Sequence, residues 1–212
     1  MTTAVVPFKD LDAAKERLSA RLTKGERMAL VLAMVEDVLG ALSRVAELSG
    51  LLVVTREPEI ARRASTLGAE ILEEPVNEGH TRAVERAARL LEERRAPAML
   101  CVSGDVPGVV AGEITSMLRA LGPAPSAVLV PSRDGRGTNA VLVSPPMALP
   151  LRFGEPSFPN HVAKAKELGL RTEILSLPGL GLDLDTPEDV DTFLRTPSDT
   201  ETYRLLRGRR SS

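Results

Sequence analysis

The sequence predicts a single α/β domain of Rossmann-like type, with a mostly parallel or mixed sheet and helices on both faces. Three observations indicate this class. Apolar strand-like runs alternate with helix-like segments along nearly the whole chain. The runs are apolar almost throughout, as is typical of strands that are covered on both faces. The length of 212 residues suits one domain with a sizeable core.

The first half of the chain contains three predicted strands separated by two predicted helices. Pro7 ends the first strand. Between residues 28 and 45, apolar residues recur every three to four positions, which predicts a helix that Gly50 stops. Gly68 closes the second helix. In chain order, the predicted elements are strand 3–6, helix 24–48, strand 51–55, helix 57–67 and strand 69–72.

The second half continues the alternation. The predicted elements are helix 81–95, strand 98–102, helix 112–121, strands 127–131 and 139–143, helix 159–168 and strand 172–177. A last helix begins after Thr186, which is the predicted N-cap, with Pro187 in its first position. No repeat or linker interrupts residues 1–196, which we assign to one domain. We expect residues 197–212 to form a frayed, solvated C-terminal tail that carries Arg204, Arg207, Arg209 and Arg210.

Composition and charge exclude several classes of protein. The net charge is −2, from 27 basic and 29 acidic residues, whereas a protein that coats nucleic acid needs a basic excess. Aromatic residues make up 2% of the chain, too few for stacking single-stranded bases. The lone Cys101 excludes an internal disulfide framework and a multi-cysteine metal site. The first residues contain no apolar run long enough for a signal or a membrane span, so we expect a cytoplasmic protein.

The segment around Asp183 and Asp185 says most about chemistry. In an extended chain, Leu182 and Leu184 point to one face and the two aspartates to the other. Two carboxylates then converge at the end of a strand, which suits a hard divalent cation. The alternative is a charged strand end whose second aspartate helps to cap the helix that follows.

A third aspartate, Asp105, directly follows the apolar strand 98–102 and lies between Gly104 and Pro107. A carboxylate at such a position is costly unless it is paired or bound to a metal. We therefore interpret Asp105 as a metal ligand. The alternative is a cap on the next helix, although that helix is predicted to start late, at residue 112.

Three basic residues lie close together after the first strand. Lys9, Lys15 and Arg17 fall within nine positions and can surround a polyphosphate. Neither a P-loop nor a dinucleotide-binding glycine motif is present, which excludes those two nucleotide folds. The alternative for these residues is a charged first helix that is exposed to water.

The segment 133–140 is a candidate anion-binding loop. Gly135 and Gly137 let backbone amides point at a ligand, and Thr138 and Asn139 add polar side chains. The alternative is an ordinary β-hairpin turn.

Ser157 stands close to a predicted helix start, where free amides favour a phosphate or a carboxylate. His161 lies one turn further along the same helix, where it either touches substrate or simply packs or caps. The other histidine, His80, fits a helix start better than a catalytic base.

Taken in order, these segments resemble the guanylyltransferases that act on 2-phospho-L-lactate or phosphoenolpyruvate in making the deazaflavin coenzyme F420. That family is similar to the wider MobA-like nucleotidyltransferases, which have a single mixed α/β domain. The resemblance spans residues 5–194, and each of its motifs is specific only in combination with the others. The motifs are Pro-x-Lys and Ala-Lys-x-Arg-Leu within 7–18, Gly-Asp-Val-Pro at 104–107, Gly-Arg-Gly-Thr-Asn at 135–139, Arg-Phe-Gly at 152–154 and Asp-x-Asp-Thr-Pro at 183–187.

The resemblance implies a set of site residues. The expected Mg²⁺ ligands are Asp105, Asp183 and Asp185. The expected catalytic residues are Lys15, Arg17 and Asp105. The expected nucleotide-binding residues are Pro7, Lys9, Lys15, Gly79 and Thr81, and those for the phosphorylated acid are Thr138, Asn139, Gly154 and Ser157. Thr81 stands where the family has an asparagine near the nucleotide base, so the resemblance leaves base selectivity open.

The implied reaction moves GMP from GTP onto a phosphorylated three-carbon acid and releases pyrophosphate. The acid is phosphoenolpyruvate, 2-phospho-L-lactate or 3-phospho-D-glycerate, and the Arg-rich composition favours the first. The expected partners are therefore GTP and a small phosphorylated carboxylic acid, with no nucleic acid and no membrane. A phosphate monoester is largely ionised at neutral pH, so the reaction needs no general base. It needs positioning and charge neutralisation, from Mg²⁺ and from Lys15 and Arg17 with Lys9.

Two other functions remain open. A molybdenum-cofactor or cytidylyl nucleotidyltransferase would share the fold, but we would expect a Gly-rich first loop, which this chain lacks. A non-catalytic nucleotide-binding module could keep the fold without needing three acids.

Overall fold

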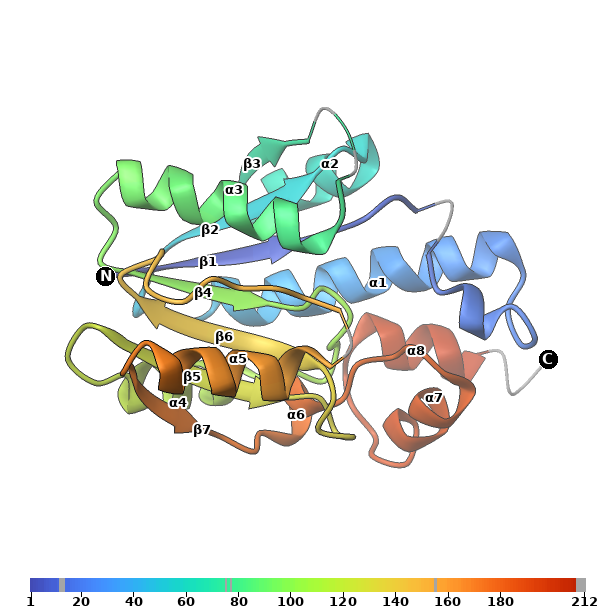
Figure 1. Cartoon of the computed structure of the whole chain (residues 1–212). Helices are drawn as coiled ribbons and strands as arrows, with labels where there is room; N and C mark the ends of the chain where they lie inside the picture. Colours follow the sequence, from blue (N-terminus) through green and yellow to red (C-terminus); the bar gives the residue numbers. More distant parts are fainter. Residues whose placement is uncertain (12–13, 75, 77, 155, 209–212) are drawn as a thin grey trace.

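The computed structural model describes the whole chain except residues 12–13, 75, 77, 155 and 209–212 (Figure 1). Within the described residues, seven strands form one sheet in the order β3-β2-β1-β4-β6-β5-β7. The strands are β1 (Thr2–Pro7), β2 (Leu48–Thr55), β3 (Glu70–Glu73), β4 (Ala98–Val102), β5 (Ser126–Pro131), β6 (Thr138–Ser144) and β7 (Arg171–Ile174).

The helices connect the strands and cover the sheet. They are α1 (Lys24–Ser43), α2 (Pro58–Thr66), α3 (His80–Glu93), α4 (Ala111–Ala120), α5 (Ser157–Glu167), α6 (Pro178–Gly181), α7 (Pro187–Phe193) and α8 (Glu201–Gly208), with a 3₁₀ turn η1 (Glu16–Leu18) before α1. None of the helices in the described part of the chain combines the length and the apolar character that crossing a membrane requires.

The sheet is mixed, as the sequence predicts. Strand β6 runs antiparallel to both of its neighbours, β4 and β5, whereas the remaining neighbouring pairs are parallel. Because β6 is reversed, its first residues lie at the edge where β1 and β4 end. Thr138 and Asn139 therefore reach the same edge of the sheet as the loops after β1 and β4.

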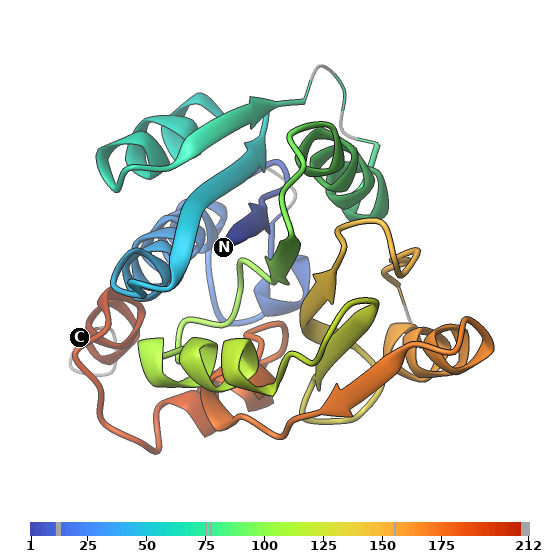
Figure 2. The same cartoon turned by 90° about the vertical axis from the view of Figure 1, so that its left-hand side faces the viewer.

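Both faces of the sheet are covered, which explains why β1, β4, β5 and β6 are buried and mostly apolar. In β4, Leu100 and Val102 pack with α1, α2, α4 and α8, whereas Met99 and Cys101 pack with α3 and α5. Figure 2 shows α3 and α5 on one side of the sheet and α1, α2 and α8 on the other. The alternation of successive side chains thus supplies two separate cores.

The order in which the chain adds strands to the sheet reverses between β1 and β4. The chain first builds β2 and β3 on one side of β1 and then returns to place β4 on the other side. Ligands of open α/β sheets bind in the crevice that such a reversal leaves at the carboxyl ends of the strands. The loops after β1 and β4 carry Lys9 and Asp105, so the topology itself brings two of the predicted motifs together.

The predicted helix 24–48 is wrong at its C-terminal end. Helix α1 stops at Ser43, and Gly50 lies inside β2 instead of ending a helix. Backbone pairing explains the difference, since Thr2 and Thr3 in β1 pair with Leu48 and Gly50 in parallel register. Local helix propensity in this stretch is overridden by a sheet partner that lies far away in the sequence.

Other boundaries differ by a few residues, for example at α5 and β7. Helix α5 begins at Ser157, two residues before the predicted start, and the strand predicted for 172–177 is β7, which ends at Ile174. The Thr186–Pro187 helix start is confirmed: the Thr186 hydroxyl accepts from the amide of Asp189, and the Asp189 carboxylate accepts from the amide of Thr186.

The expectation of a frayed tail is wrong for the residues of α8, which pack on α1 and bury Thr202 and Leu206. The Asp37 carboxylate on α1 accepts from the amides of Glu201 (2.7 Å) and Thr202 (2.9 Å). A residue of another helix therefore shares the capping of α8 with Thr200, whose hydroxyl accepts from the amide of Tyr203 at 3.2 Å. Arg209 and Arg210 lie outside the described residues.

Removing this cap should weaken the C-terminal packing. We expect Asp37→Ala to lower the free energy of unfolding by about 1 kcal/mol, because two helix-end amides lose their acceptor. Urea unfolding followed by circular dichroism measures the change, with Glu47→Ala at an exposed carboxylate as the matched control. Equal midpoints for the two variants would contradict the capping role.

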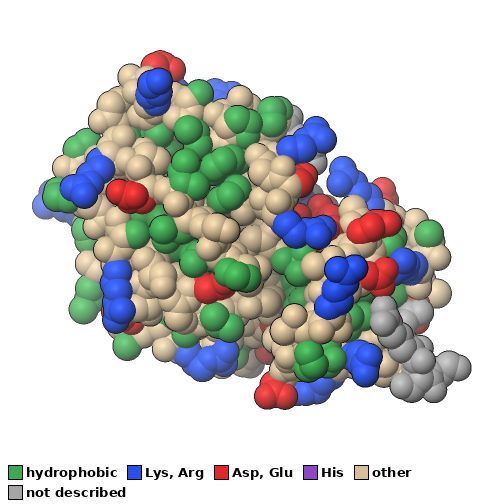
Figure 3. Space-filling view, turned by 90° about the horizontal axis from the view of Figure 1, so that it is seen from below, with side chains coloured by type: hydrophobic (Ala, Val, Ile, Leu, Met, Phe, Trp, Pro, Cys, Tyr) green, Lys and Arg blue, Asp and Glu red, His purple; other side chains and the backbone are tan. Residues whose placement is uncertain are grey.

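The surface carries charges of both signs. On the face seen from below, Lys and Arg side chains lie among Asp and Glu side chains, with hydrophobic patches between them (Figure 3). The charges on this face are interspersed and not sorted by sign, which agrees with the small net charge of −2.

Candidate active site

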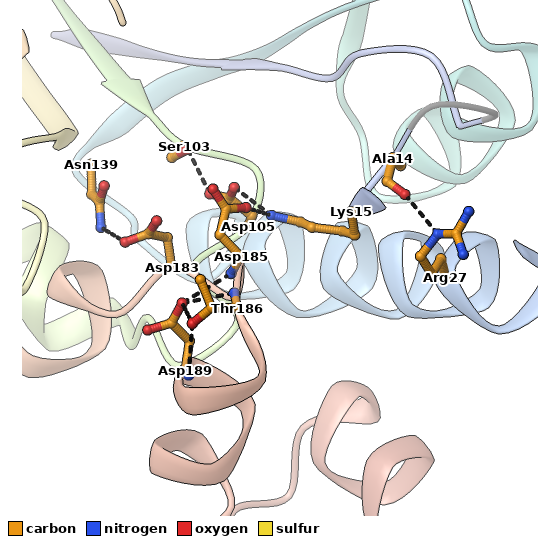
Figure 4. A network of polar contacts seen from close by, with 10 residues as sticks. All are labelled: Ala14, Lys15, Arg27, Ser103, Asp105, Asn139, Asp183, Asp185, Thr186 and Asp189. Atoms are coloured by element: carbon orange, nitrogen blue, oxygen red, sulfur yellow. Dashed lines mark hydrogen bonds and ion pairs between the residues drawn. The ribbon is translucent and has the colours of Figure 1, made fainter. Parts of the chain in front are cut away.

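Lys15 joins two of the three predicted metal ligands. Its Nζ lies 2.7 Å from Oδ2 of Asp105 and 2.5 Å from Oδ1 of Asp185, although the three residues are far apart in the sequence (Figure 4). The Lys15 side chain is only 9% exposed. Burial alone would lower the pKa of Lys15, but the charges of Asp105 and Asp185 outweigh it and the pKa is raised. Lys15 is therefore a buried ammonium held by two carboxylates.

The backbone of Lys15 is strained. Its φ of 54° and ψ of 40° put it in the left-handed region, which non-glycine residues rarely adopt. Such strain costs of order 1–3 kcal/mol and persists where surrounding contacts over-determine the conformation. The two carboxylates supply those contacts, and the strained turn aims the lysine at the acids after β4 and before α7.

Asp105 is held on both sides. Its Oδ1 accepts from the Ser103 hydroxyl at 2.7 Å, while Oδ2 faces Lys15. Burial would raise the pKa of Asp105, but the Lys15 charge and the two hydrogen bonds lower it to about 2. Asp105 is thus ionised at neutral pH. It caps no helix, since the N-cap position of α4 is Val110, so that alternative is wrong.

The segment before α7 packs as its alternating pattern predicts. Leu184 is fully buried, and its amide donates to the carbonyl of Asp105 at 3.0 Å. This backbone bond joins the two acid-bearing loops and leaves Asp183 and Asp185 facing the cleft. The helix is capped by Thr186 and Asp189, so the carboxylate of Asp185 is not used as its cap.

Asp183 is oriented by an amide side chain. Asn139 at the start of β6 is buried, and its Nδ2 donates to Oδ1 of Asp183 (3.0 Å) and to the carbonyl of Leu180 (2.9 Å). Burial raises the pKa of Asp183, and the charges of Asp105 and Asp185 raise it further. Three carboxylates therefore share one region, and among the described residues the Lys15 ammonium is the one paired with them.

The donor set at these acids suits a hard cation, although it is not preassembled around one. In the part of the chain that the structure describes, no three His, Cys, Asp or Glu side chains are grouped as a metal would need. The Lys15 ammonium stands between two of the acids instead. The three carboxylates outnumber this ammonium, so the site carries excess negative charge. Besides burial, this charge raises the pKa of Asp183. A divalent cation would neutralise it.

Two cavities meet at Asp105 and Asp185. The first, of about 320 Å³, we call the lysine lobe; its lining includes Pro7, Lys9, Lys15, His80 and Ser103. The second, of about 410 Å³, we call the hydroxyl lobe; its lining includes Gly79, Thr81, Thr138, Asn139, Gly154, Ser157 and Asp183. Lys9, His80 and Ser103 line both lobes. The two lobes together form one cleft with the acids at its centre.

The structure brings together all but one of the predicted site residues. Arg17 is exposed on η1 and is not among the residues lining either lobe. Gly79 and Thr81, which the resemblance assigns to the nucleotide, line the hydroxyl lobe beside Thr138 and Ser157. Thr81 also binds backbone: its Oγ1 accepts from the amide of Phe153 at 2.9 Å, which fastens α3 to the loop before α5.

The hydroxyl lobe is backed by a buried hydrogen-bond chain. Thr138 Oγ1 lies 3.1 Å from Ser157 Oγ and 3.0 Å from His161 Nδ1, and His161 Nε2 accepts from the amide of Arg152 at 2.9 Å. His161 is 1% exposed and does not line the lobe, so it lies behind Thr138. Burial lowers the pKa of His161 to about 4.

The start of α5 supplies fewer backbone donors than the sequence suggests. The amide of Phe158 donates to the carbonyl of Arg136 at 3.0 Å, and Pro159 has no amide hydrogen. Ser157 at this helix start lines the lobe, and its hydroxyl is a donor there besides the backbone. Gly154, with a φ of 121°, turns the chain just before it in a conformation that favours glycine.

Two residues that line both lobes, Ser103 and His80, are not among the residues that the sequence predicts for the site. Ser103 orients Asp105, and His80 lines both lobes at the start of α3 with its ring centroid 4.3 Å from that of Phe153. Burial and the Lys9 charge lower the pKa of His80 to about 4. The position of Ser103, two residues before an acid at a strand end, is a signal that could have found it.

Larger cavities lie elsewhere in the molecule. One of about 600 Å³ is lined by residues such as Leu177 and Phe193, and one of about 1110 Å³ lies along α1, α2 and α8. The first touches the candidate anion-binding loop at Arg133 and Gly135, but neither cavity is lined by any of the expected metal-binding, catalytic, nucleotide-binding or acid-binding residues. The chemistry of the lining side chains, and not the volume, therefore identifies the candidate site.

Comparisons with known proteins agree with this geometry. The family model described as "Guanylyl transferase CofC like" matches residues 2–211. A phosphoenolpyruvate guanylyltransferase from Conexibacter woesei is 39% identical over 91% of this chain and 86% of that protein. A 3-phospho-D-glycerate guanylyltransferase from Colwellia psychrerythraea is 34% identical over 97% of this chain and 98% of that protein. A 2-phospho-L-lactate guanylyltransferase from Methanothermobacter thermautotrophicus is 32% identical over 97% of this chain and 90% of that protein.

Solved structures show the same fold at low sequence identity. A nucleotidyl transferase from Methanothermobacter thermautotrophicus superposes with a TM-score of 0.66 at 18% identity, covering 93% of this chain and 99% of that one. A protein from Desulfovibrio desulfuricans described with the nucleotide-diphospho-sugar transferases gives a TM-score of 0.80 at 17% identity, covering 99% and 95%. The fold is that of the nucleotidyltransferases.

Proposed function

The chain belongs to the guanylyl transferase family described as CofC like, and on that premise we propose that it transfers GMP from GTP to phosphoenolpyruvate in coenzyme F420 biosynthesis. The resemblance of the motifs to guanylyltransferases is thereby confirmed at the level of the family. Among the three relatives compared, the one named for phosphoenolpyruvate shares more identity with this chain than those named for the other two acids. The choice of acceptor is the part of the proposal that needs a direct test.

The observation that carries the proposal is the two-lobed cleft with acids at its centre. The lysine lobe offers Lys9 and Lys15 to a polyphosphate, and the hydroxyl lobe offers the Ser157 hydroxyl, beside Thr138, to a second anion. Transfer between two anionic substrates needs two adjoining pockets whose charge is neutralised where they meet. The two lobes supply the pockets, and the acids between them would hold the cation that neutralises this charge.

The reaction that fits the cleft is an in-line displacement. An oxygen of the acceptor phosphate attacks the α-phosphorus of GTP, a new P–O–P linkage forms, and the bond to the β-phosphate breaks to release pyrophosphate. The attacking phosphate is largely ionised at neutral pH, so no side chain has to remove a proton. Burial and the Lys9 charge lower the pKa of His80 in the cleft to about 4, which agrees with a reaction that needs no general base.

We further propose that Asp105, Asp183 and Asp185 hold Mg²⁺ during the reaction. Bound there, the ion would supply positive charge at the α-phosphate where the two lobes meet. Asn139 and Ser103 fix the directions of Asp183 and Asp105 and so support such a site. Lys15 already contacts Asp105 and Asp185, so cation and ammonium compete for the same two carboxylates.

A panel of substrates tests the proposed function. The purified protein is incubated with Mg²⁺, one of four nucleoside triphosphates and one of three acceptors: phosphoenolpyruvate, 2-phospho-L-lactate or 3-phospho-D-glycerate. We expect pyrophosphate release with GTP and phosphoenolpyruvate to exceed release with every other pair. A preference for CTP would indicate a cytidylyl-type enzyme, and binding of GTP without turnover on any acceptor would indicate a non-catalytic module.

A further inference from the structure

We propose that His161 is a positioning residue that fixes the direction of a buried hydrogen-bond chain, so that the Ser157 hydroxyl donates to an anionic oxygen of the acceptor. The chain runs from the amide of Arg152 through His161 and Thr138 to Ser157. The inference rests on the proposed function, because it assigns the hydroxyl lobe to the acceptor. It gives His161 a role that involves no contact with substrate.

The first link fixes the tautomer of the ring. A backbone amide can only donate, so the Arg152 amide at 2.9 Å requires an acceptor at His161 Nε2. In a protonated ring, Nε2 carries a hydrogen that would point at the hydrogen of that amide. The same clash would arise in a neutral ring with its hydrogen on Nε2. The ring is therefore neutral with its hydrogen on Nδ1, which agrees with the lowered pKa of the buried imidazole.

The second link passes this direction to Thr138. Nδ1 of His161 donates to Thr138 Oγ1 at 3.0 Å. Within the described residues, Thr138 Oγ1 has one further partner, Ser157 Oγ at 3.1 Å. Thr138 is buried, so its own hydrogen needs an acceptor, and Ser157 Oγ supplies it. The bond between the two hydroxyls then runs from Thr138 to Ser157.

The last link reaches the cleft. Ser157 Oγ accepts from Thr138, which leaves the hydrogen of Ser157 for another acceptor, and Ser157 lines the hydroxyl lobe. An anion in the lobe accepts hydrogen bonds and donates none. With the direction reversed, Ser157 would donate to Thr138 and turn its lone pairs towards that anion. His161 thereby decides whether Ser157 attracts or repels the acceptor.

The ring also holds the neighbouring loop. Because His161 Nε2 accepts the hydrogen bond from the Arg152 amide, the ring ties the loop before α5 to that helix. The Phe153 ring lies edge-on to the His161 ring, with the two centroids 5.4 Å apart. Gly154 of the same loop lines the hydroxyl lobe. One buried side chain therefore orients a hydroxyl and holds a stretch of backbone on the acceptor side of the cleft.

Steady-state kinetics of four variants test the inference. His161→Leu removes both ring contacts and Thr138→Val removes the relaying hydroxyl. For both we expect the KM for phosphoenolpyruvate to rise roughly tenfold to a hundredfold, which corresponds to the loss of one hydrogen bond to a charged group. The KM for GTP should stay within about twofold, because the lysine lobe is untouched.

Thr138→Ser restores the hydroxyl and should return the acceptor KM towards the wild-type value. Val162→Ala, which removes packing from the same helix against the same core, is the matched control and should leave both KM values unchanged.

A spectroscopic measurement tests the direction of the chain without any turnover. The protein has two histidines, so the ring nitrogens of His161 can be assigned by comparing ¹H–¹⁵N spectra of wild type and His161→Asn. We expect the tautomer with hydrogen on Nδ1 across neutral pH. Hydrogen on Nε2, or a charged ring, would overturn the inference even if the enzyme proves inactive on every acceptor.

The possible failures are distinguishable. An inactive wild-type protein would contradict the proposed function, while the tautomer would still decide the direction of the chain. An active wild type whose acceptor KM is unchanged in folded His161→Leu and Thr138→Val would overturn the positioning role. Equal rises in both KM values would also overturn it, since they would indicate a general loss of structure. Should His161→Leu fail to fold, Thr138→Val and its serine rescue carry the kinetic test.

Discussion

Replacing Lys15 with methionine should lower turnover about a hundredfold or more and raise the KM for GTP far more than the KM for the acceptor. Methionine keeps most of the length of the side chain but removes the only charge that this residue brings to the lysine lobe. Steady-state kinetics with each substrate varied in turn measure the split. Unchanged constants for GTP would contradict the assignment of Lys15 to the polyphosphate. Arg17→Ala provides a comparison: Arg17 is exposed and does not line the lobe, so we expect a smaller effect on the same constant.

The same substitution has a consequence for cation binding that needs no turnover. In the free protein the Lys15 ammonium occupies Oδ2 of Asp105 and Oδ1 of Asp185. Without it those oxygens are available, so Lys15→Met should bind Mn²⁺ about tenfold more tightly than wild type in the absence of nucleotide. Electron paramagnetic resonance of free Mn²⁺ measures this affinity. Lys166→Met, a change at an exposed lysine, is the control. Weaker Mn²⁺ binding by Lys15→Met would mean that ammonium and cation do not compete.

Lys15→Met should have a lower free energy of unfolding than wild type unless a cation is present. Breaking a buried ion pair leaves a charge without its partner and typically costs 3–5 kcal/mol, but Asp185 is 41% exposed and water compensates part of the loss. We therefore expect a decrease of about 2 kcal/mol in the free energy of unfolding, largely restored by millimolar Mn²⁺ or Mg²⁺. Urea unfolding with and without the ion provides the measurement.

Neutralising either Asp105 or Asp183 should abolish turnover, with losses of about a thousandfold or more. Asparagine preserves the shape of each side chain but removes the negative charge on which the proposed cation site depends. Pyrophosphate release at saturating substrates measures the loss, and Glu188→Gln at an exposed carboxylate of α7 is the control. Substantial turnover with Mg²⁺ in either variant would show that the proposed ligand set is wrong.

The two variants should differ in stability, which separates loss of chemistry from loss of fold. Asp105→Asn removes a partner of the buried Lys15 ammonium, so we expect it to destabilise the protein. Asp183 has its pKa raised by burial and by the charges of Asp105 and Asp185, so its ionised form is disfavoured in the folded state. Asp183→Asn should therefore leave the free energy of unfolding unchanged or raise it. Equal destabilisation by both substitutions would contradict this electrostatic account.

Much of the fold is readable from local patterns. The continuous apolar runs predict a sheet covered on both faces, and the capping signal at Thr186 and Pro187 marks a helix start that the structure confirms. The strand 98–102 is predicted to the residue because a purely apolar run leaves little choice of boundary. The wrong boundaries at Gly50 and in the tail share one cause. In both places a distant segment, β1 for Gly50 and Asp37 for α8, supplies hydrogen bonds that the local sequence does not announce.

The sequence by itself determined the family, the order of the elements from β1 to β7 and the residue types of the cleft, because motifs and apolar periodicity are local properties of the chain. Only the tertiary structure decided which groups meet. It set the Lys15 ammonium between Asp105 and Asp185, left Arg17 outside the cleft and put His161 behind Thr138. These contacts join residues that are distant in sequence, and they depend on strand order, on the reversal of β6 and on one strained turn at Lys15. Charge pairing and hydrogen-bond direction are properties of such contacts, so they arise only once the chain has folded.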